Sequence, residues 1–208
     1  MSLFPLLLLT APEGVPEAPS PPTPGVLAAK ATTHCGDPEN LAYLAFTLET
    51  RVDGVLTDSR SVEWSPRKNT ATVTWGEHRV ELTQLSPYIA SEASPELAIQ
   101  AYQHWAHDTF RLLAACEAQH PAAVSTVSED GRLHLEFGEE ALIRWGDHYW
   151  YQLNADGSVQ DLEFRLSSGE SGRFSWTGYK RVGPLYLATE RISTDGHTWL
   201  KFAELQVR

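Results

Sequence analysis

Two histidines and an aspartate lie close together in a segment with helical periodicity. His104, His107 and Asp108 occupy positions i, i+3 and i+4, which share one helix face and could grip a metal ion. A further histidine would be needed, and His120 is the nearest in sequence. The H-E-x-x-H pattern of zinc enzymes is absent, and the neighbouring aromatic residues indicate a packed helix face. We therefore expect no metal site, and interpret His104 and Asp108 as a capped or solvated pair.

Carboxylate pairs and nucleophile motifs give no stronger case for catalysis. Glu129-Asp130 and Glu139-Glu140 resemble the acidic pairs of glycosidases, but both flank predicted turns, where carboxylates are usually solvated. The chain has no G-x-S-x-G elbow for acyl transfer and no glycine-rich phosphate loop after a strand. The sequence therefore favours a protein that is not an enzyme and that uses no cofactor.

Aromatic residues are the remaining candidates for a functional site. The chain has seven Trp, seven Tyr and seven Phe, and open barrels of this size can hold one acyl chain or a small apolar ligand. The alternative is that the same side chains fill the core, because protein interiors are normally close-packed. The candidate lining residues are Phe46, Trp64, Trp75, Tyr102, Trp105, Phe110, Trp150, Phe164 and Trp176, with Tyr186 as a further member.

Length and charge limit what kind of protein this is. The chain of 208 residues can build one sizeable core. Its formal net charge is −11, and its basic residues are scattered rather than clustered. A nucleic-acid partner requires a clustered basic surface, and an anionic membrane would repel the domain at long range. We therefore expect no nucleic-acid partner.

The N-terminal segment resembles an export leader. A short apolar run from Leu3 to Leu9, interrupted by Pro5, resembles the apolar region of a signal peptide, although no Lys or Arg precedes it. It is far too short to span a bilayer, and a Pro-rich spacer follows it over residues 11–24. We expect residues 1–24 to be a degenerate leader and linker, and residues 25–208 to be one domain of the periplasm or cell envelope with no integral membrane span. The alternative is an apolar start to a flexible tail.

Hydrophobic periodicity predicts the elements that must position these residues. Val26 to His34 is a candidate helix, and a second helix begins at Pro95 after the capping residue Ser94 and extends to Cys116. Period-2 alternation between turn signals is typical of antiparallel strands. It predicts roughly eleven strands, at residues 44–51, 59–64, 69–75, 78–82, 124–127, 133–137, 148–154, 159–166, 174–181, 185–192 and 199–207.

Three segments resemble the LolA, LolB and LppX type of lipoprotein-carrier proteins. The start THCGDPENLAYLAFTLE is similar to the HGG…W…L…F opening of uncharacterised LolA-like bacterial proteins. AYQHWAHDTFRLLAA is similar to their lid segment, and FSWTGYKRVGPLYLATERI to their W-x-x-Y-x-x-V hairpin. The resemblance covers roughly residues 26–208. It implies an α+β, mostly β fold: an antiparallel meander forming an open half β-barrel, with helices on the concave face.

The same resemblance implies a function. We expect a non-enzymatic envelope protein that binds an apolar moiety, a lipid or a lipoprotein acyl chain, between the curved sheet and a helical lid. The lid would be the helix Pro95–Cys116, with Trp105 and Phe110 pointing inward. Two alternatives stay open: a structural or interaction module with a filled core that docks a protein partner, and a hydrolase.

The implied fold also brings the two cysteines within reach of each other. Cys35 ends the N-terminal helix and Cys116 ends the lid segment, and in this fold both helices sit on the concave side. An export leader would place both thiols in an oxidising compartment, which favours a disulfide. The alternative is two buried free thiols that act as small hydrophobic side chains.

Overall fold

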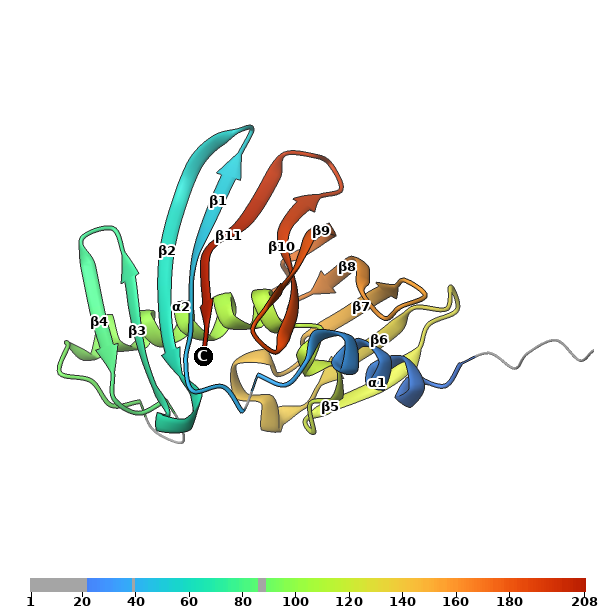
Figure 1. The fold of residues 1–208 in the computed structure, drawn as a ribbon, viewed down its shortest axis with the longest axis horizontal. Coiled ribbons are helices and arrows are strands. Elements are labelled where there is room, and N and C mark those ends of the chain that lie inside the picture. The colour runs from blue at the N-terminus through green and yellow to red at the C-terminus, as the bar shows by residue number, and fades with distance from the viewer. Residues whose placement is uncertain (1–21, 39, 86–88) are drawn as a thin grey trace, which may run out of the picture.

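Eleven antiparallel strands form one sheet that does not close on itself (Figure 1). The computed structural model describes residues 22–38, 40–85 and 89–208, without the side chains of Leu142 and Ile143, so the predicted leader and most of the linker lie outside the described residues. The spatial order is β4-β3-β2-β1-β11-β10-β9-β8-β7-β6-β5. The strands are β1 Leu44–Val52, β2 Val55–Ser65, β3 Thr70–Trp75, β4 His78–Leu82, β5 Ala123–Val127, β6 Leu133–Phe137, β7 His148–Leu153, β8 Val159–Arg165, β9 Ser171–Val182, β10 Leu185–Ser193 and β11 Thr198–Val207.

The first hairpin is longer than the periodicity predicted. β2 begins at Val55 rather than Ser59, and Val52 pairs with Val55 across the turn Asp53-Gly54. Both turn residues have positive φ, 51° and 80°. Such a turn matches the twist of the flanking strands, so pairing starts immediately on both sides of it.

The helix α2 (Pro95–Leu113) crosses the concave face of the sheet, as expected (Figure 1). The Ser94 side chain caps its first turn by accepting a hydrogen bond from the Leu97 amide at 3.4 Å. The helix ends at Leu113 rather than Cys116, because the chain continues as the 3₁₀ helix η2 (Cys116–Gln119).

Two aromatic residues of α2 point toward the sheet, as the lid interpretation required. The Trp105 ring meets Trp64 of β2 edge-on, with centroids 5.8 Å apart. Phe110 lies 4.9 Å from the ring of Tyr149 of β7. Aromatic contacts therefore fix the helix to both halves of the sheet, the strands that precede it in the chain (β1–β4) and those that follow it (β5–β11). Tilted and edge-to-face arrangements are the ones that aromatic rings prefer.

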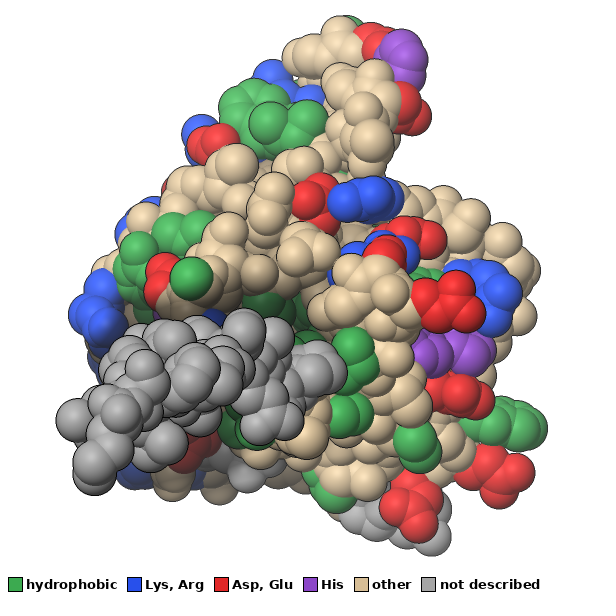
Figure 2. Space-filling view, turned by 90° about the vertical axis from the view of Figure 1, so that its right-hand side faces the viewer, with side chains coloured by type: hydrophobic (Ala, Val, Ile, Leu, Met, Phe, Trp, Pro, Cys, Tyr) green, Lys and Arg blue, Asp and Glu red, His purple; other side chains and the backbone are tan. Residues whose placement is uncertain are grey.

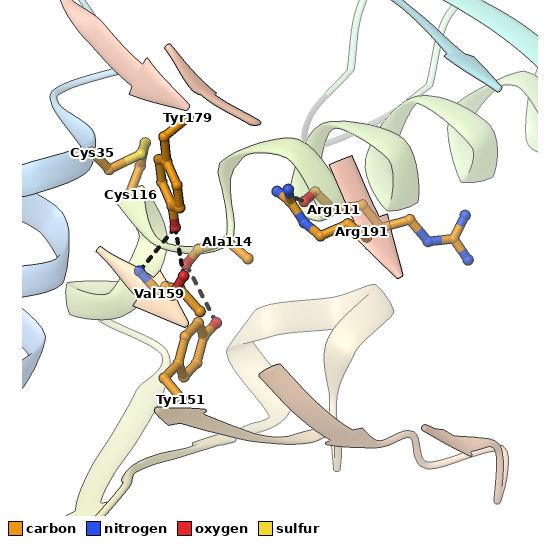
Figure 3. Close-up of a disulfide and its surroundings, with 8 residues drawn as sticks. All are labelled: Cys35, Arg111, Ala114, Cys116, Tyr151, Val159, Tyr179 and Arg191. Carbon is orange, nitrogen blue, oxygen red and sulfur yellow. Dashed lines mark hydrogen bonds between the residues drawn. A yellow bond between two sulfur atoms is a disulfide. The ribbon is translucent and has the colours of Figure 1, made fainter. Parts of the chain in front are cut away.

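The helix α1 (Pro24–Cys35) lies near the other end of the sheet, where it contacts η2, β5, β6 and β10. Cys35 and Cys116 form a disulfide with their Cα atoms 5.0 Å apart (Figure 3). The bond joins α1 to the segment that follows α2. Among the described residues no helix is both long enough and apolar enough to cross a membrane.

We expect the disulfide to contribute strongly to stability. It spans 81 positions of the sequence, and cross-linking a loop of this length stabilises a fold by about 4 kcal/mol in the chain-entropy model. Urea unfolding of the wild-type protein should shift to lower denaturant when a reductant is added. The double variant Cys35→Ser, Cys116→Ala is the control, since its midpoint should already be low and should not respond to reductant. A wild-type midpoint that ignores complete reduction would contradict the expectation.

Candidate functional site

A cavity of about 870 Å³ lies between α2 and the middle of the sheet. The volume falls within the roughly 300–1,000 Å³ typical of small-molecule sites. Its walls come from α2 on one side and from strands of both sheet halves on the other. The apolar and aromatic residues that line it are Ala106, Phe110, Ala114, Tyr149, Leu162, Phe164, Leu166, Phe174, Trp176 and Leu200.

A charged network anchors α2 at the cavity wall. Asp108 of α2 is completely buried, and its carboxylate accepts two hydrogen bonds from Arg60 of β2, at 2.8 and 3.1 Å. Arg111, one helical turn further, donates to the same carboxylate at 3.1 Å. Asp58 of β2 pairs with Arg60 from the solvent side, at 2.8 Å. A bidentate arginine–carboxylate contact has defined geometry, so this network sets where the helix sits over the sheet.

A second buried carboxylate lies on the opposite wall. Asp147 accepts hydrogen bonds from the Tyr149 hydroxyl at 3.0 Å and from the Ser167 amide at 2.8 Å. Burial, followed by the negative charge of Asp147, raises the pKa of Tyr149 well above its usual range. The phenol therefore stays protonated and acts as a hydrogen-bond donor to Asp147. Both buried carboxylates of the site are thus held as acceptors by protein donors, in the manner of structural groups.

Arg191 of β10 is the cavity residue with the most unusual environment. It is 2% exposed, and its guanidinium carbon lies 3.5 Å from the centre of the Trp176 ring. Its Nη1 donates to the carbonyls of Ala188 at 2.9 Å and Glu190 at 3.1 Å, and its Nη2 donates to the carbonyl of Arg111 at 3.2 Å. Figure 3 shows the side chain beside the backbone of α2. Desolvation lowers the pKa of Arg191 to about 9, which leaves it charged at neutral pH.

The structure places eight of the nine predicted lining residues in three groups, and Trp150 apart from them. Phe110, Phe164 and Trp176 line the cavity. Phe46 packs against Phe202 in the core, with ring centroids 5.8 Å apart. A third group, Trp64, Trp75, Tyr102 and Trp105, packs between α2 and the first sheet half.

Trp150 lies on the face of the sheet that is turned away from the cavity. It pairs with His134 and Glu163 in the strand register, and its ring stacks on His134 with centroids 4.7 Å apart. Side chains alternate between the two faces of a strand, so Trp150 is opposite in direction to its neighbour Tyr149, which lines the cavity. Tyr186 lies elsewhere, in a groove beside α1.

The candidate metal ligands are separated in space. His104 packs against Trp75 with ring centroids 5.1 Å apart, whereas His107 lines the cavity. His120 instead accepts a hydrogen bond from the Ala122 amide at 3.1 Å. In the described part of the chain, no three His, Cys, Asp or Glu side chains are grouped so that they could hold a metal ion.

The acidic residues singled out in the sequence lie in two different environments. The expectation that Asp108 forms a solvated or capped pair with His104 is wrong, because Asp108 is buried and bound by Arg60. That partner lies 48 residues earlier in the chain, so the sequence pattern around Asp108 could not identify it. The acidic pairs Glu129-Asp130 and Glu139-Glu140 are exposed.

The sequence interpretation missed the arginines of the site. Arg60 of β2 and Arg191 of β10 are charged residues that line the cavity, and the sequence interpretation gave them no role. The signal that could have identified Arg191 is its alternation in phase with Leu185 and Leu187, which places a charge on the buried face of the strand. Figure 2 shows acidic, basic and apolar side chains mixed over the side of the molecule that it displays, without one broad patch. The side shown therefore displays no single charged or apolar patch that would compete with the cavity as a candidate site.

We expect Asp108→Asn to destabilise the protein by about 3–5 kcal/mol, because it leaves the largely buried Arg60 without its main counter-charge. The matched control is Asp58→Asn, which removes the other partner of Arg60. The Asp58 side chain is 42% exposed, so its loss should cost about 1 kcal/mol or less. Chemical denaturation of the three proteins measures both effects. Equal losses in the two variants would show that the buried pair does not anchor the helix.

Comparison with known proteins supports a fold but no sequence family. No family model and no curated protein matches the sequence. The structure is similar to that of a LolA superfamily protein from Nitrosomonas europaea, with a TM-score of 0.51 and 13% sequence identity, over 89% of this chain and 94% of that one. It is also similar to a DUF1329 family protein from Desulfovibrio piger, with a TM-score of 0.46 and 7% identity, over 87% of this chain and 90% of that one.

The first similarity extends over most of both chains. The identity of 13% is too low to transfer an activity. The chain therefore has a LolA-like fold: one open antiparallel sheet with a helix across its concave face.

Proposed function

We propose that the domain binds an apolar moiety, such as a lipid or a lipoprotein acyl chain, in the cavity between α2 and the sheet. The observation that carries the proposal is the cavity itself, with its wall of Leu162, Phe164, Phe174 and Trp176 from β8 and β9. The LolA-like fold supports it, because the sequence resemblance to lipoprotein carriers implies a ligand held between a curved sheet and a helical lid.

The energetics of such binding are hydrophobic. Each buried CH₂ group contributes about 0.8 kcal/mol. A chain of a dozen carbons would thus be held at roughly micromolar strength after the costs of ordering the ligand. Tighter binding requires polar contacts at one end of the ligand.

The alternative functions account for less of the site. A filled-core interaction module explains the aromatic residues packed around Trp64 and Phe46, but not the volume beneath the C-terminal half of α2. A hydrolase needs a free carboxylate or an activated nucleophile, whereas Asp108 and Asp147 are engaged by protein donors. We therefore propose a binding protein that does not catalyse a reaction.

We also propose that the protein works in an oxidising compartment, the periplasm or cell envelope. The disulfide between Cys35 and Cys116 supports this location, since such bonds persist mainly in oxidising environments. The apolar run at the N-terminus supports it as well, as an export signal that lacks the usual basic residues.

Displacement of a fluorescent fatty-acid probe by oleyl alcohol, a neutral lipid, tests the binding proposal. We expect the wild-type protein to bind with a dissociation constant near the micromolar range. Phe164→Ser should weaken binding about tenfold or more, because it removes a large apolar surface from the cavity wall.

The matched control is Trp150→Ser on the opposite face of the sheet, where the lost ring stacks on His134 rather than lining the cavity. This variant should bind as the wild type does. Circular dichroism and denaturation of both variants establish that they are folded. If the wild-type protein binds no apolar probe, or if both variants lose binding equally, the cavity is not the binding site.

A further inference from the structure

We infer that the ligand of this cavity is an amphiphile with an anionic head group, a carboxylate or a phosphate, and that Arg191 receives the head group. The inference rests on the proposed binding function and specifies its ligand class. The apolar wall alone would suit any hydrocarbon. The charge at Arg191 restricts the choice.

Arg191 carries a buried charge. No Asp or Glu among the described residues pairs with it. Its partners are three backbone carbonyls and the face of the Trp176 ring. These dipoles stabilise a cation only partly. Removing an ion from water is unfavourable, and a well-placed charge of opposite sign with good hydrogen-bond geometry offsets part of that cost.

The guanidinium also has donors to spare. Nη1 uses both of its hydrogens on Ala188 and Glu190, and Nη2 uses one on Arg111. The Nε–H and the second hydrogen of Nη2 have no protein acceptor in the described part of the chain. A planar carboxylate or a phosphate accepts adjacent N–H groups of an arginine more strongly than a neutral oxygen does.

The other arginines around the cavity differ from Arg191 in this respect. Arg60 and Arg111 share the carboxylate of Asp108. Arg144 pairs with Glu117 and stacks over the rings of Phe110 and Phe137. Arg173 pairs with Asp161 at 3.5 Å. Each therefore has its counter-charge within the protein, whereas that of Arg191 would have to come from a ligand.

The neighbourhood of Arg191 suits the rest of an amphiphile. In the strand register Arg191 stands between Trp176 of β9 and Leu200 of β11, and both residues line the cavity. Phe174 and Leu162 extend the same wall. A head group at Arg191 would therefore have its hydrocarbon chain directly on apolar side chains, with no polar gap to cross.

The net charge of the chain indicates how binding of an anionic ligand should respond to salt. With a net charge of −11, the protein attracts no anion at long range. Recognition of an anionic head group would have to arise from short-range contacts inside the cavity. The dissociation constant should therefore depend only weakly on salt, because buried pairs are screened much less than exposed ones.

Two pairs of ligands that share one hydrocarbon chain test the inference. Oleate is compared with oleyl alcohol, and oleoyl-lysophosphatidate with monooleoylglycerol, in the same displacement assay at concentrations below micelle formation. We expect the anionic member of at least one pair to bind about tenfold or more tightly than the neutral one. A preference in the first pair alone identifies a fatty-acid carboxylate, and in the second alone a lipid phosphate.

The outcomes separate this inference from the function on which it rests. If neutral and anionic members bind equally well, the head-group inference is overturned while the cavity remains a lipid site. If no ligand of either pair binds, the proposed function itself fails.

A pair of variants assigns the effect to Arg191. Arg191→Gln should reduce the ratio of the anionic to the neutral ligand's affinity to about one, whatever the absolute affinity of the variant for oleyl alcohol. The matched control is Arg165→Gln, whose guanidinium lies over Trp150 on the far face and which should keep the preference. The readout is a ratio of two affinities in one protein, so a modest loss of stability does not affect it. If Arg191→Gln does not fold, the wild-type ligand pairs still decide.

Discussion

The pairing of β1 with β11 is the interaction on which the rest of the structure depends. It joins the first strand of the chain to the last, from Leu44 opposite Val207 to Val52 opposite Thr198. Without it, the strands before α2 and those after it would form two meanders, each with an additional exposed edge. The joined sheet is one curved surface, and Thr50 and Leu200, which pair across this junction, both line the cavity.

The helix α2 serves the two sheet halves in different ways. Tyr102 and Trp105 pack one side of the helix against the early strands and leave little space. Ala106 and the C-cap residue Ala114 present small side chains to the cavity. Space remains there because small side chains do not fill it, while Asp108 holds the helix in place through a charged contact that needs no close apolar packing. The same helix thus closes one half of the sheet and roofs a site over the other.

Much of the fold could be predicted from the sequence because its signals are local. A strand with one buried face shows period-2 alternation whatever it pairs with, and Ser94-Pro95 and Asp53-Gly54 carry their capping and turn chemistry within a few residues. The strand count, both helices and the inward direction of Trp105 and Phe110 followed from such signals. The disulfide needed one further assumption, that both helices lie on the same side of the sheet.

The sequence by itself therefore determined the elements, their order and the acidic, aromatic-rich character of the domain. Only the tertiary structure decided which aromatic residues face open space. Phe164 and Trp150 are both aromatic residues within strands of alternating pattern, so the sequence does not distinguish their directions. In the structure Phe164 points toward the cavity and Trp150 away from it. The tertiary structure also decided which charged side chains form ion pairs. Asp108 pairs with Arg60 on a distant strand, whereas Arg191 has no carboxylate partner among the described residues. Ion pairing depends on distance in space, which strand order sets and local sequence does not.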